Sequence, residues 1–443
     1  MKLTGILPGL SEPFARVFNV LPALAPQRAR TIAAHRADDG KASGDPLSEE
    51  LAARIDKQLI LPIARESDEE TSRAAVQDYG QFLARQDRWE ELSALIHDVD
   101  LTRRATACAT SHAELLSYGA RADVIHATED ALLDGKSPSL DGIEALEEIL
   151  MEHPTDYAIA VIVALAHIDI GWAWRGQGWA HTLPEKNLRL FEAHFERADD
   201  ILGLFDHIEA RAPLLLAARC ALMGGQAMSK ERLADAYERL IALDPGNPRP
   251  LRTMGHHLLP RWHGAYDLLE LEARRATSLT SRTWGQGGYF WSFMDALAID
   301  PGAARVLDLD YFLDGMRDIL ERHPTQYFAN LMAAYAAITM DPARTAPNAP
   351  DIQRNTRAAI FESLDWILSH YLYELHPMVW AQAAVTSESA TPLPIRKANM
   401  RRGVLAARRA VARHFASDLL DGTTVAFSKH GLRLFPLGHA ATE

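Results

Sequence analysis

The stretch "GHHLLPRWHG", residues 255–264, holds the densest group of side chains that could do chemistry: His256, His257 and His263. Imidazoles bind metals and move protons near neutral pH, so one hypothesis is an enzyme with a histidine-containing pocket around residues 255–264. On a helix, however, His256 and His257 would point about 100° apart and could not share a metal. Pro260 would end that helix. We therefore favour a joint between two helices, with no metal and no cofactor.

A concentration of tryptophan is the second signal. Six of the nine tryptophans lie within 120 residues, beside the glycine-rich turns "WRGQGW" (174–179) and "WGQGGYFW" (284–291). Rigid aromatic rings give much contact area for little entropy lost, which is typical of recognition surfaces. We predict a ligand-binding groove lined by these rings and by arginines suited to a carboxylate or phosphate: Trp174, Arg175, Trp179, Arg261, Trp262, Trp284 and Trp291. The alternative is that the rings fill gaps in irregular helix packing.

Sequence motifs of several catalytic classes are missing. The segment "DGKSP" (134–138) lacks the upstream glycine of a phosphate-binding loop, and no G-x-S-x-G nucleophile elbow or H-E-x-x-H zinc motif occurs. The acids Asp308 and Asp310 are expected to cap the helix that follows them. The sequence thus favours a non-enzymatic protein whose partner is a protein or peptide.

Residues 395–415 form a basic segment with seven lysines and arginines and no acid. As a helix it has an apolar stripe of Met400, Val404, Ala407, Val411 and Phe415, and most of its arginines lie on the opposite side. Such a helix could make the protein a membrane-surface adaptor or bind an acidic partner. The other interpretation is a terminal helix whose basic face is solvated, or is neutralised by acids of the same chain.

These side chains must be positioned by helices, because helical periodicity runs through most of the chain. We expect an N-terminal extended arm and linker (1–48), an N-terminal helical region (49–140), helical repeats (141–341) and a C-terminal helical region (351–443). The last region contains the basic helix, and a short hairpin is expected within residues 423–435, where apolar and polar residues alternate. The predicted fold class is all-α.

Three segments of the chain share one layout. Each has an amphipathic helix, a proline (Pro154, Pro245 or Pro324), a short turn and a second helix. Five residues before each proline stands a branched apolar residue, and ten after it stands a small one: Ile149, Leu240 and Ile319, then Ala164, Gly255 and Ala334. A helix pair of this size cannot bury its apolar faces alone, so pairs stack and share a core.

The second copy resembles the tetratricopeptide repeat. In "AYERLIALDPGNPRPLRTMG" the spacing of the apolar residues, of Pro245 and of Gly255 is similar to that motif, and Ala221 stands 34 residues before Gly255. The resemblance implies an irregular superhelix with a C-terminal helical cap, because the prolines are 91 and 79 residues apart. A looser similarity over residues 140–280 to an uncharacterised bacterial family, in "WAWRGQGWA" and "LPRWHGAYD", implies no activity.

Composition limits the partners and the compartment. The formal net charge of −13 argues against a general nucleic-acid binder, which needs a basic surface. The two cysteines, Cys108 and Cys220, are too few for a disulfide framework. The apolar run at 157–166 is shorter than the roughly 20 residues of a membrane span, and the N-terminus makes a poor signal peptide. A cytoplasmic location is expected; the oligomeric state is left open.

Overall fold

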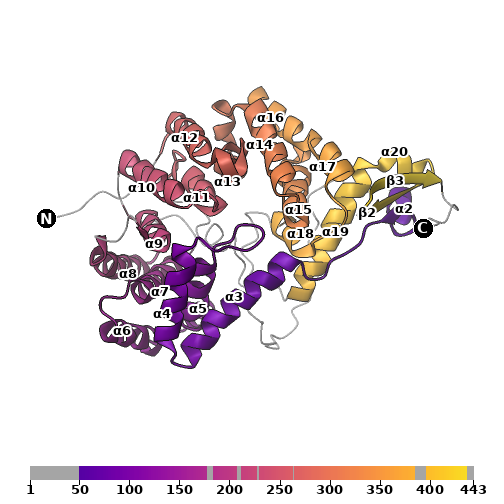
Figure 1. Ribbon diagram of the computed structural model, residues 1–443. Helices are drawn as coiled ribbons and strands as arrows, with labels where there is room; N and C mark the ends of the chain where they lie inside the picture. The colour runs from indigo at the N-terminus through magenta and orange to yellow at the C-terminus, as the bar shows by residue number, and fades with distance from the viewer. Residues whose placement is uncertain are drawn as a thin grey trace. The chain divides into compact units, whose positions relative to one another are not determined.

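The computed structural model is almost entirely helical (Figure 1). It describes residues 49–176, 183–206, 211–226, 229–262, 264–384 and 396–436. The all-α class predicted from the periodicity is confirmed, and the only sheet in these described ranges is small, with three strands. The predicted N-terminal arm, residues 1–48, lies outside the described residues. The superhelical arrangement of the helices stays a prediction.

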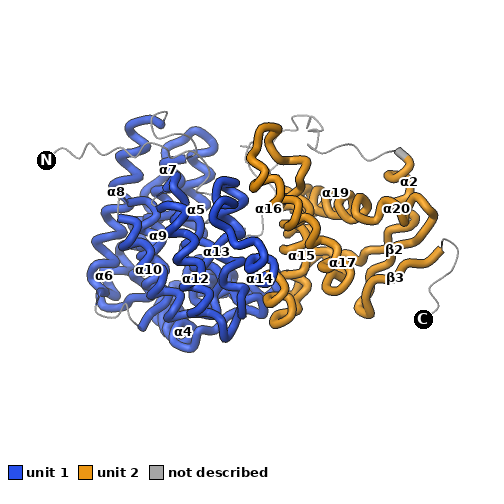
Figure 2. The backbone as a smooth tube through the Cα atoms, turned by 90° about the horizontal axis from the view of Figure 1, so that it is seen from above, with its two compact units in different colours: residues 1–23, 69–315 blue, residues 24–68, 316–443 orange. Residues whose placement is uncertain are grey.

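The chain divides into two units, drawn in two colours in Figure 2. Among the described residues, unit 1 is 69–315 and unit 2 is 49–68 with 316–443. In this division residues 49–68 belong with the C-terminal part of the chain. The regions expected from the sequence stay a prediction.

Unit 1 is built from consecutive helices joined by short turns. Its helices are α3 (Asp68–Arg85), α4 (Trp89–Leu101), α5 (His112–Leu133), α6 (Asp141–Glu152), α7 (Tyr157–Arg175), α8 (Glu185–Gly203), α9 (Pro213–Met223), α10 (Lys230–Leu243), α11 (Pro248–His257), α12 (Tyr266–Trp284), α13 (Gly287–Ile299) and, crossing the unit boundary, α14 (Leu309–Arg322). A short 3₁₀ turn, Pro301–Arg305, precedes α14, which Asp308 caps by accepting from the Tyr311 N–H at 3.1 Å.

The three proline turns are helix–turn–helix joints, as the repeated layout predicts. They connect α6 to α7, α10 to α11 and α14 to α15 (Gln326–Ala334). In each joint a polar side chain caps the second helix: Asp156, Asn247 and Thr325 accept from backbone N–H groups of its first turn. The cap supplies partners for N–H groups that a helix start leaves unsatisfied.

The small residues of the layout are all buried, and Gly255 shows why size matters there. A Cβ atom at Gly255 would lie 1.7 Å from the carbonyl oxygen of Ser292. At Gly255 the backbone of α11 therefore lies directly against the backbone of α13, the second helix of the next hairpin. Ala164 and Ala334, the matching residues of the other copies, are 0% and 1% exposed.

Helix α7 forms the centre of unit 1 and packs against α5, α6, α8 and α9 (Figure 1). It is the one described helix long and apolar enough to cross a membrane, and 67% of that stretch is buried inside the protein. Its apolar sequence includes a histidine and an aspartate, and each contacts a neighbouring helix. His167 contacts Glu147 of α6, and Asp169 accepts from Arg121 of α5.

Unit 2 combines the remaining helices with the sheet. Its elements are α2 (Glu49–Gln58), β1 (Leu59–Ile60), α15, a π-helical turn (Tyr335–Thr339), a 3₁₀ turn (Pro342–Arg344), α16 (Asp351–Glu362), α17 (Leu364–His370), α18 (Pro377–Ala384), α19 (Arg396–His414), α20 (Ala416–Leu420), β2 (Thr423–Ser428) and β3 (Gly431–Pro436). The hairpin expected within 423–435 is present as antiparallel β2 and β3, joined by Lys429 and His430.

One local expectation is corrected: residues 59–60 are not helical. Leu59 and Ile60 form β1, which pairs in parallel with Val425 and Ala426 of β2. Pro62 explains the change, because proline disfavours the helical conformation in the residue before it and cannot continue a helix.

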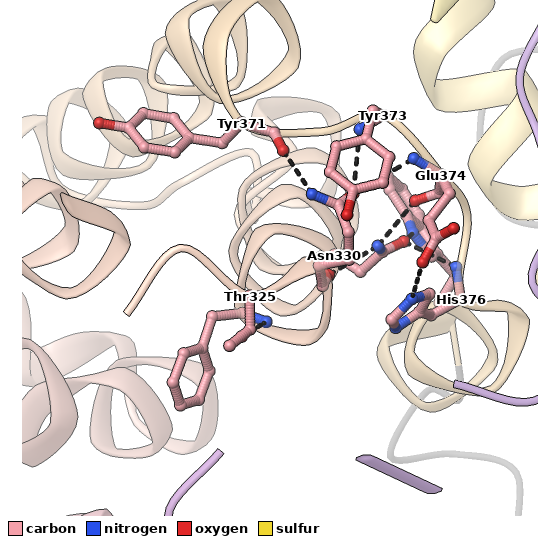
Figure 3. Close-up of polar contacts among 9 residues, drawn as sticks. Thr325, Asn330, Tyr371, Tyr373, Glu374 and His376 are labelled. Atoms are coloured by element: carbon pink, nitrogen blue, oxygen red, sulfur yellow. Dashed lines mark hydrogen bonds and ion pairs between the residues drawn. The ribbon is translucent and has the colours of Figure 1, made fainter. Parts of the chain in front are cut away.

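A buried amide network holds the third proline joint in unit 2 (Figure 3). Asn330 of α15 is 0% exposed; its amide donates to the Glu374 carbonyl at 2.9 Å, and its carbonyl accepts from the His376 N–H at 2.9 Å. The same oxygen accepts from the indole of Trp380 at 2.8 Å. Thr325 caps α15 beside this network. Because the fully buried Asn330 makes all these bonds, the loop between α17 and α18 is fixed to α15.

Candidate functional site

The histidine stretch of the sequence is the end of a buried helix. Both His256 and His257 are 0% exposed, and α11 ends at His257. The Nδ1 atom of His257 lies 2.9 Å from the hydroxyl of Tyr237 on α10, and the ring of His256 meets Trp262 edge to face at 5.3 Å. These contacts join α10, α11 and the following turn. The site behaves as a joint between helices, the interpretation that the sequence favoured; His263 lies outside the described residues.

The rings of His256 and His257 stand on adjacent helix positions, with their centroids 5.5 Å apart. In the part of the chain that the structure describes, no three His, Cys, Asp or Glu side chains are grouped as ligands of one ion.

Three of the predicted groove tryptophans are core residues instead. Trp284 and Trp291 are 0% and 1% exposed and contact each other edge to face at 5.8 Å, and Trp262 is 7% exposed. The indole N–H of Trp284 donates to the carbonyl of Pro245 at 3.2 Å, so this ring fixes the second proline joint. These rings offer almost no surface to a partner. They fill the helix packing, which was the alternative to the groove.

The other predicted groove residues are divided between two places. Arg261 is half-buried and donates to the carbonyl of Ile299 at 3.3 Å. At the end of α7, Trp174 is half-buried and lies 5.2 Å from the ammonium of Lys186. Arg175 beside it is 5% exposed, and burial lowers its pKa. Trp179 lies outside the described residues. The six of these residues that the structure describes are therefore not brought together on one surface.

The basic helix has the buried stripe that its sequence predicts. On α19, Ala407 and Val411 are 0% exposed and Phe415 just after it is 7% exposed. Gly403 lies on the same face, where a Cβ atom would come within 1.8 Å of the Pro377 carbonyl oxygen, so α19 packs closely on α18. The stripe thus attaches the helix to unit 2.

Acids of the same unit neutralise part of the basic face. Arg396 pairs with Glu66 at 3.1 Å, and Arg408 pairs with Asp56 at 3.3 Å and donates to a carbonyl of α2. These cations belong to the structure of unit 2.

Four further cations of α19 point outward: Lys397, Arg401, Arg402 and Arg409 are exposed. Among the described residues, no carboxylate is within ion-pair distance of these four. Leu405 lies between them and is 51% exposed. This surface, named here the α19 basic face, consists of these five residues.

A polar cluster between α5 and α7 escaped the sequence analysis. The Nε atom of Arg121 donates to Asp169 at 2.8 Å, and its guanidinium lies 5.2 Å from the ring of Tyr118. The hydroxyl of Tyr118 is 3.4 Å from the Nε2 atom of His126. One helical face of α5 carries all these residues except Asp169, so their spacing was the available signal. It was hidden because α5 mixes them with small apolar residues.

Electrostatics in this cluster are perturbed. Burial, followed by the charges of Asp169 and Asp130, raises the pKa of Glu129 on α5 to about 7. Burial lowers the pKa of His126. A carboxyl that keeps its proton near neutral pH can act as an acid, and such groups are enriched in functional sites. Carboxyl groups with a raised pKa also occur where helix packing buries neighbouring acids, so this cluster by itself defines no reaction.

Comparison with known proteins yields no relative: no family model matches the chain, and neither the curated proteins nor the solved structures contain a significant match.

Proposed function

We propose that this protein is a non-enzymatic scaffold that binds an acidic segment of a partner protein along the α19 basic face. The observation that carries the proposal is the division of the cations on α19. Some are neutralised within unit 2, whereas Lys397, Arg401, Arg402 and Arg409 are left outward. Like charges on one helix repel one another, and a partner carrying carboxylates relieves that repulsion.

The pattern around Leu405 supports a helical or extended peptide as the occupant. At about 100° per residue, Leu405 lies near the middle of the exposed face, with Lys397 and Arg401 on one side of it and Arg402 and Arg409 on the other. From Lys397 to Arg409 the helix rises about 18 Å. An acidic amphipathic segment with one apolar residue matches this spacing, since the apolar residue covers Leu405 while the carboxylates meet the cations.

A protein segment suits this face better than a membrane does. Leu405 is the one large apolar side chain that the face exposes. A single leucine inserts too little apolar surface to hold a helix in a lipid interface, where aromatic and leucine side chains line the apolar side. The resemblance to tetratricopeptide repeats, which implies a superhelix, and the low cysteine content, which suits a reducing cytoplasm, fit the same proposal.

Fluorescence anisotropy of a labelled probe tests the proposal. The probe is a glutamate-rich helical peptide with one central leucine, titrated with the full chain. We expect binding that weakens as salt is raised, because exposed charges are screened within about 10 Å at 0.1 M salt. The variant Lys397→Gln/Arg401→Gln/Arg402→Gln/Arg409→Gln should lose at least about tenfold in affinity, with an unchanged melting temperature.

A matched control removes the same charge elsewhere. Arg189, Lys230, Arg232 and Arg282 are exposed side chains of unit 1, and their replacement by Gln also removes four positive charges. This control should bind the probe as wild type does. Equal loss in both variants would mean a response to net charge alone and would defeat the proposal. Binding to vesicles containing phosphatidylserine, with no binding to the peptide, would replace the protein partner by a membrane.

A further inference from the structure

A continuous chain of polar contacts crosses three helices of unit 1. The Nδ1 atoms of His167 on α7 and His194 on α8 are 2.8 Å apart. The Nε2 atom of His167 lies 2.9 Å from a carboxylate oxygen of Glu147 on α6. Arg197 of α8 closes the chain by donating to both oxygens of Glu147, at 2.7 and 2.6 Å. Glu147 thus accepts from both neighbouring helices.

The contact between the two imidazoles requires a shared proton. Two ring nitrogens at 2.8 Å form a hydrogen bond only when one is protonated and the other is bare. Because the Nε2–H of neutral His167 donates to Glu147, its Nδ1 is bare and accepts from the Nδ1–H of His194. When both rings are imidazolium ions, two N–H groups face each other. The ring centroids are 5.1 Å apart, so the two positive charges repel each other at short range. The contact is then repulsive.

We propose that Glu147, His167, His194 and Arg197 form a pH-sensitive latch that holds α8 on α7 at neutral pH and releases it when both histidines are protonated. Release is local because the ion pair between Glu147 of α6 and Arg197 of α8 stays intact. The apolar contacts of α8, in which Phe195 packs on Trp172 of α7, then hold the helix together with the Arg197–Glu147 pair.

The charges around the latch fix its direction. Burial, followed by the charge of the neighbouring His167, lowers the pKa of His194 to about 4. Burial lowers the pKa of His167 as well, against the opposing effect of Glu147. Arg197, whose own pKa is raised by Glu147 and by Asp200, opposes protonation of His167. Both rings are therefore not charged together at neutral pH.

Linkage gives the pH window. The pKa of His194 is about 4 when the latch is closed and 6.5 in the reference state. When the pKa of a histidine is lower in the closed state than in the open one, the closed state loses stability as the pH falls below the higher, open-state pKa. Opening of the latch is therefore promoted between about pH 6.5 and pH 4.

Hydrogen–deuterium exchange of the full chain tests the latch. After correction for the intrinsic rate, amides of α8 should exchange about tenfold faster at pH 5 than at pH 7.5, while α12 and α13 keep their protection. The variant His194→Gln cannot gain a proton but can still bond to His167, so its α8 protection should not depend on pH. The control His153→Gln, in the turn between α6 and α7, should behave as wild type.

A second measurement does not depend on any variant. Long-range proton–nitrogen NMR spectra of the wild-type imidazoles report which ring nitrogens are protonated as the pH is lowered. The proposal requires the second protonation of the pair to coincide with the loss of α8 protection. Unchanged α8 protection after both rings are protonated would overturn it, as would equal pH dependence in wild type and His194→Gln.

Discussion

Helices α7 and α19 are equally long, at 19 residues each, and use their charged residues in opposite ways. The apolar α7 contains one histidine and one aspartate before its last turn, and each meets a partner on a neighbouring helix: His167 with Glu147 and Asp169 with Arg121. The basic α19 has partners for some cations and leaves the α19 basic face uncompensated.

The difference shows that helix packing requires a partner for a charged side chain in the interior but not for one at the surface. Inside unit 1, a charge without a partner would cost several kcal/mol, and His167 and Asp169 each have one on a neighbouring helix. At the surface of unit 2 an unpaired lysine or arginine costs almost nothing, so packing gives no reason for the four exposed cations of the α19 basic face in a chain whose net charge is −13. The proposed binding of an acidic segment would account for this excess.

The buried glycines of the two helices provide the prediction with the largest effect. A Cβ atom at Gly403 in α19 would lie 1.8 Å from the backbone oxygen of Pro377. At Gly171 in α7 the nearest atom would be 3.0 Å away, in the side chain of Phe195. We expect Gly403→Ala to lower the free energy of unfolding by about 3 kcal/mol, since backbone must move, and Gly171→Ala by less than about 1 kcal/mol, since a ring can shift.

Urea titrations of both variants measure this difference. Similar losses in the two variants would mean that α19 is not held against α18 by close backbone contact. The α19 basic face would then rest on a loosely attached helix, and the contrast with α7 would disappear.

Much of this contrast could be read from the sequence. The three proline joints, the buried small residues at their matching positions and the stripe of Ala407 and Val411 all follow from periodicity and from the steric limits of proline and glycine. The hairpin at 423–435 followed from alternation. Local rules sufficed for these features because each depends on residues close together in the chain.

The tryptophans show where local rules fail. Trp284 is buried against Trp291, and its indole donates to the carbonyl of Pro245, 39 residues away. Composition alone cannot distinguish a ring in a core from a ring in a groove, since both favour aromatic side chains. The cluster of Arg121 and Asp169 was missed for the same reason: its two halves are 48 residues apart. Pairing across helices is decided by tertiary structure.

The second prediction compares one arginine from each setting. Arg121 is a side chain with 8% exposure paired to Asp169, whereas Arg409 is exposed on α19. Arg121→Met should cost about 2 to 3 kcal/mol, because it leaves the carboxylate of Asp169 without its cation in a largely buried site. Arg409→Met should change stability by less than about 0.5 kcal/mol. Thermal unfolding followed by circular dichroism compares the two.

The double variant Arg121→Met/Asp169→Leu checks the cause. If the cost comes from the stranded carboxylate, removing it should restore part of the stability, so the two losses will not add. Additive losses would show that Arg121 acts through packing on Tyr118 and not through its charge.

The smallest expected effect concerns Glu129, whose side chain faces Asp169 in the same cluster. Its pKa is about 7 in the folded protein, above the reference value of 4.5, so the folded state holds a proton that the unfolded state loses between these values. Stability from this group is therefore complete below pH 4.5 and falls as the pH rises toward 7.

Replacement by a neutral side chain of the same shape should remove that penalty. We expect Glu129→Gln to be more stable than wild type by about 1 to 2 kcal/mol at pH 8 and nearly equal to it at pH 4.5, because wild-type Glu129 is then neutral too. Urea titrations across this pH range measure the gap, and Glu50→Gln, an exposed glutamate of α2, serves as the control with no such dependence. A gap that is constant with pH would mean that Glu129 is ionised throughout. The α5–α7 interface would then tolerate an unpaired charge, as the surface of α19 does.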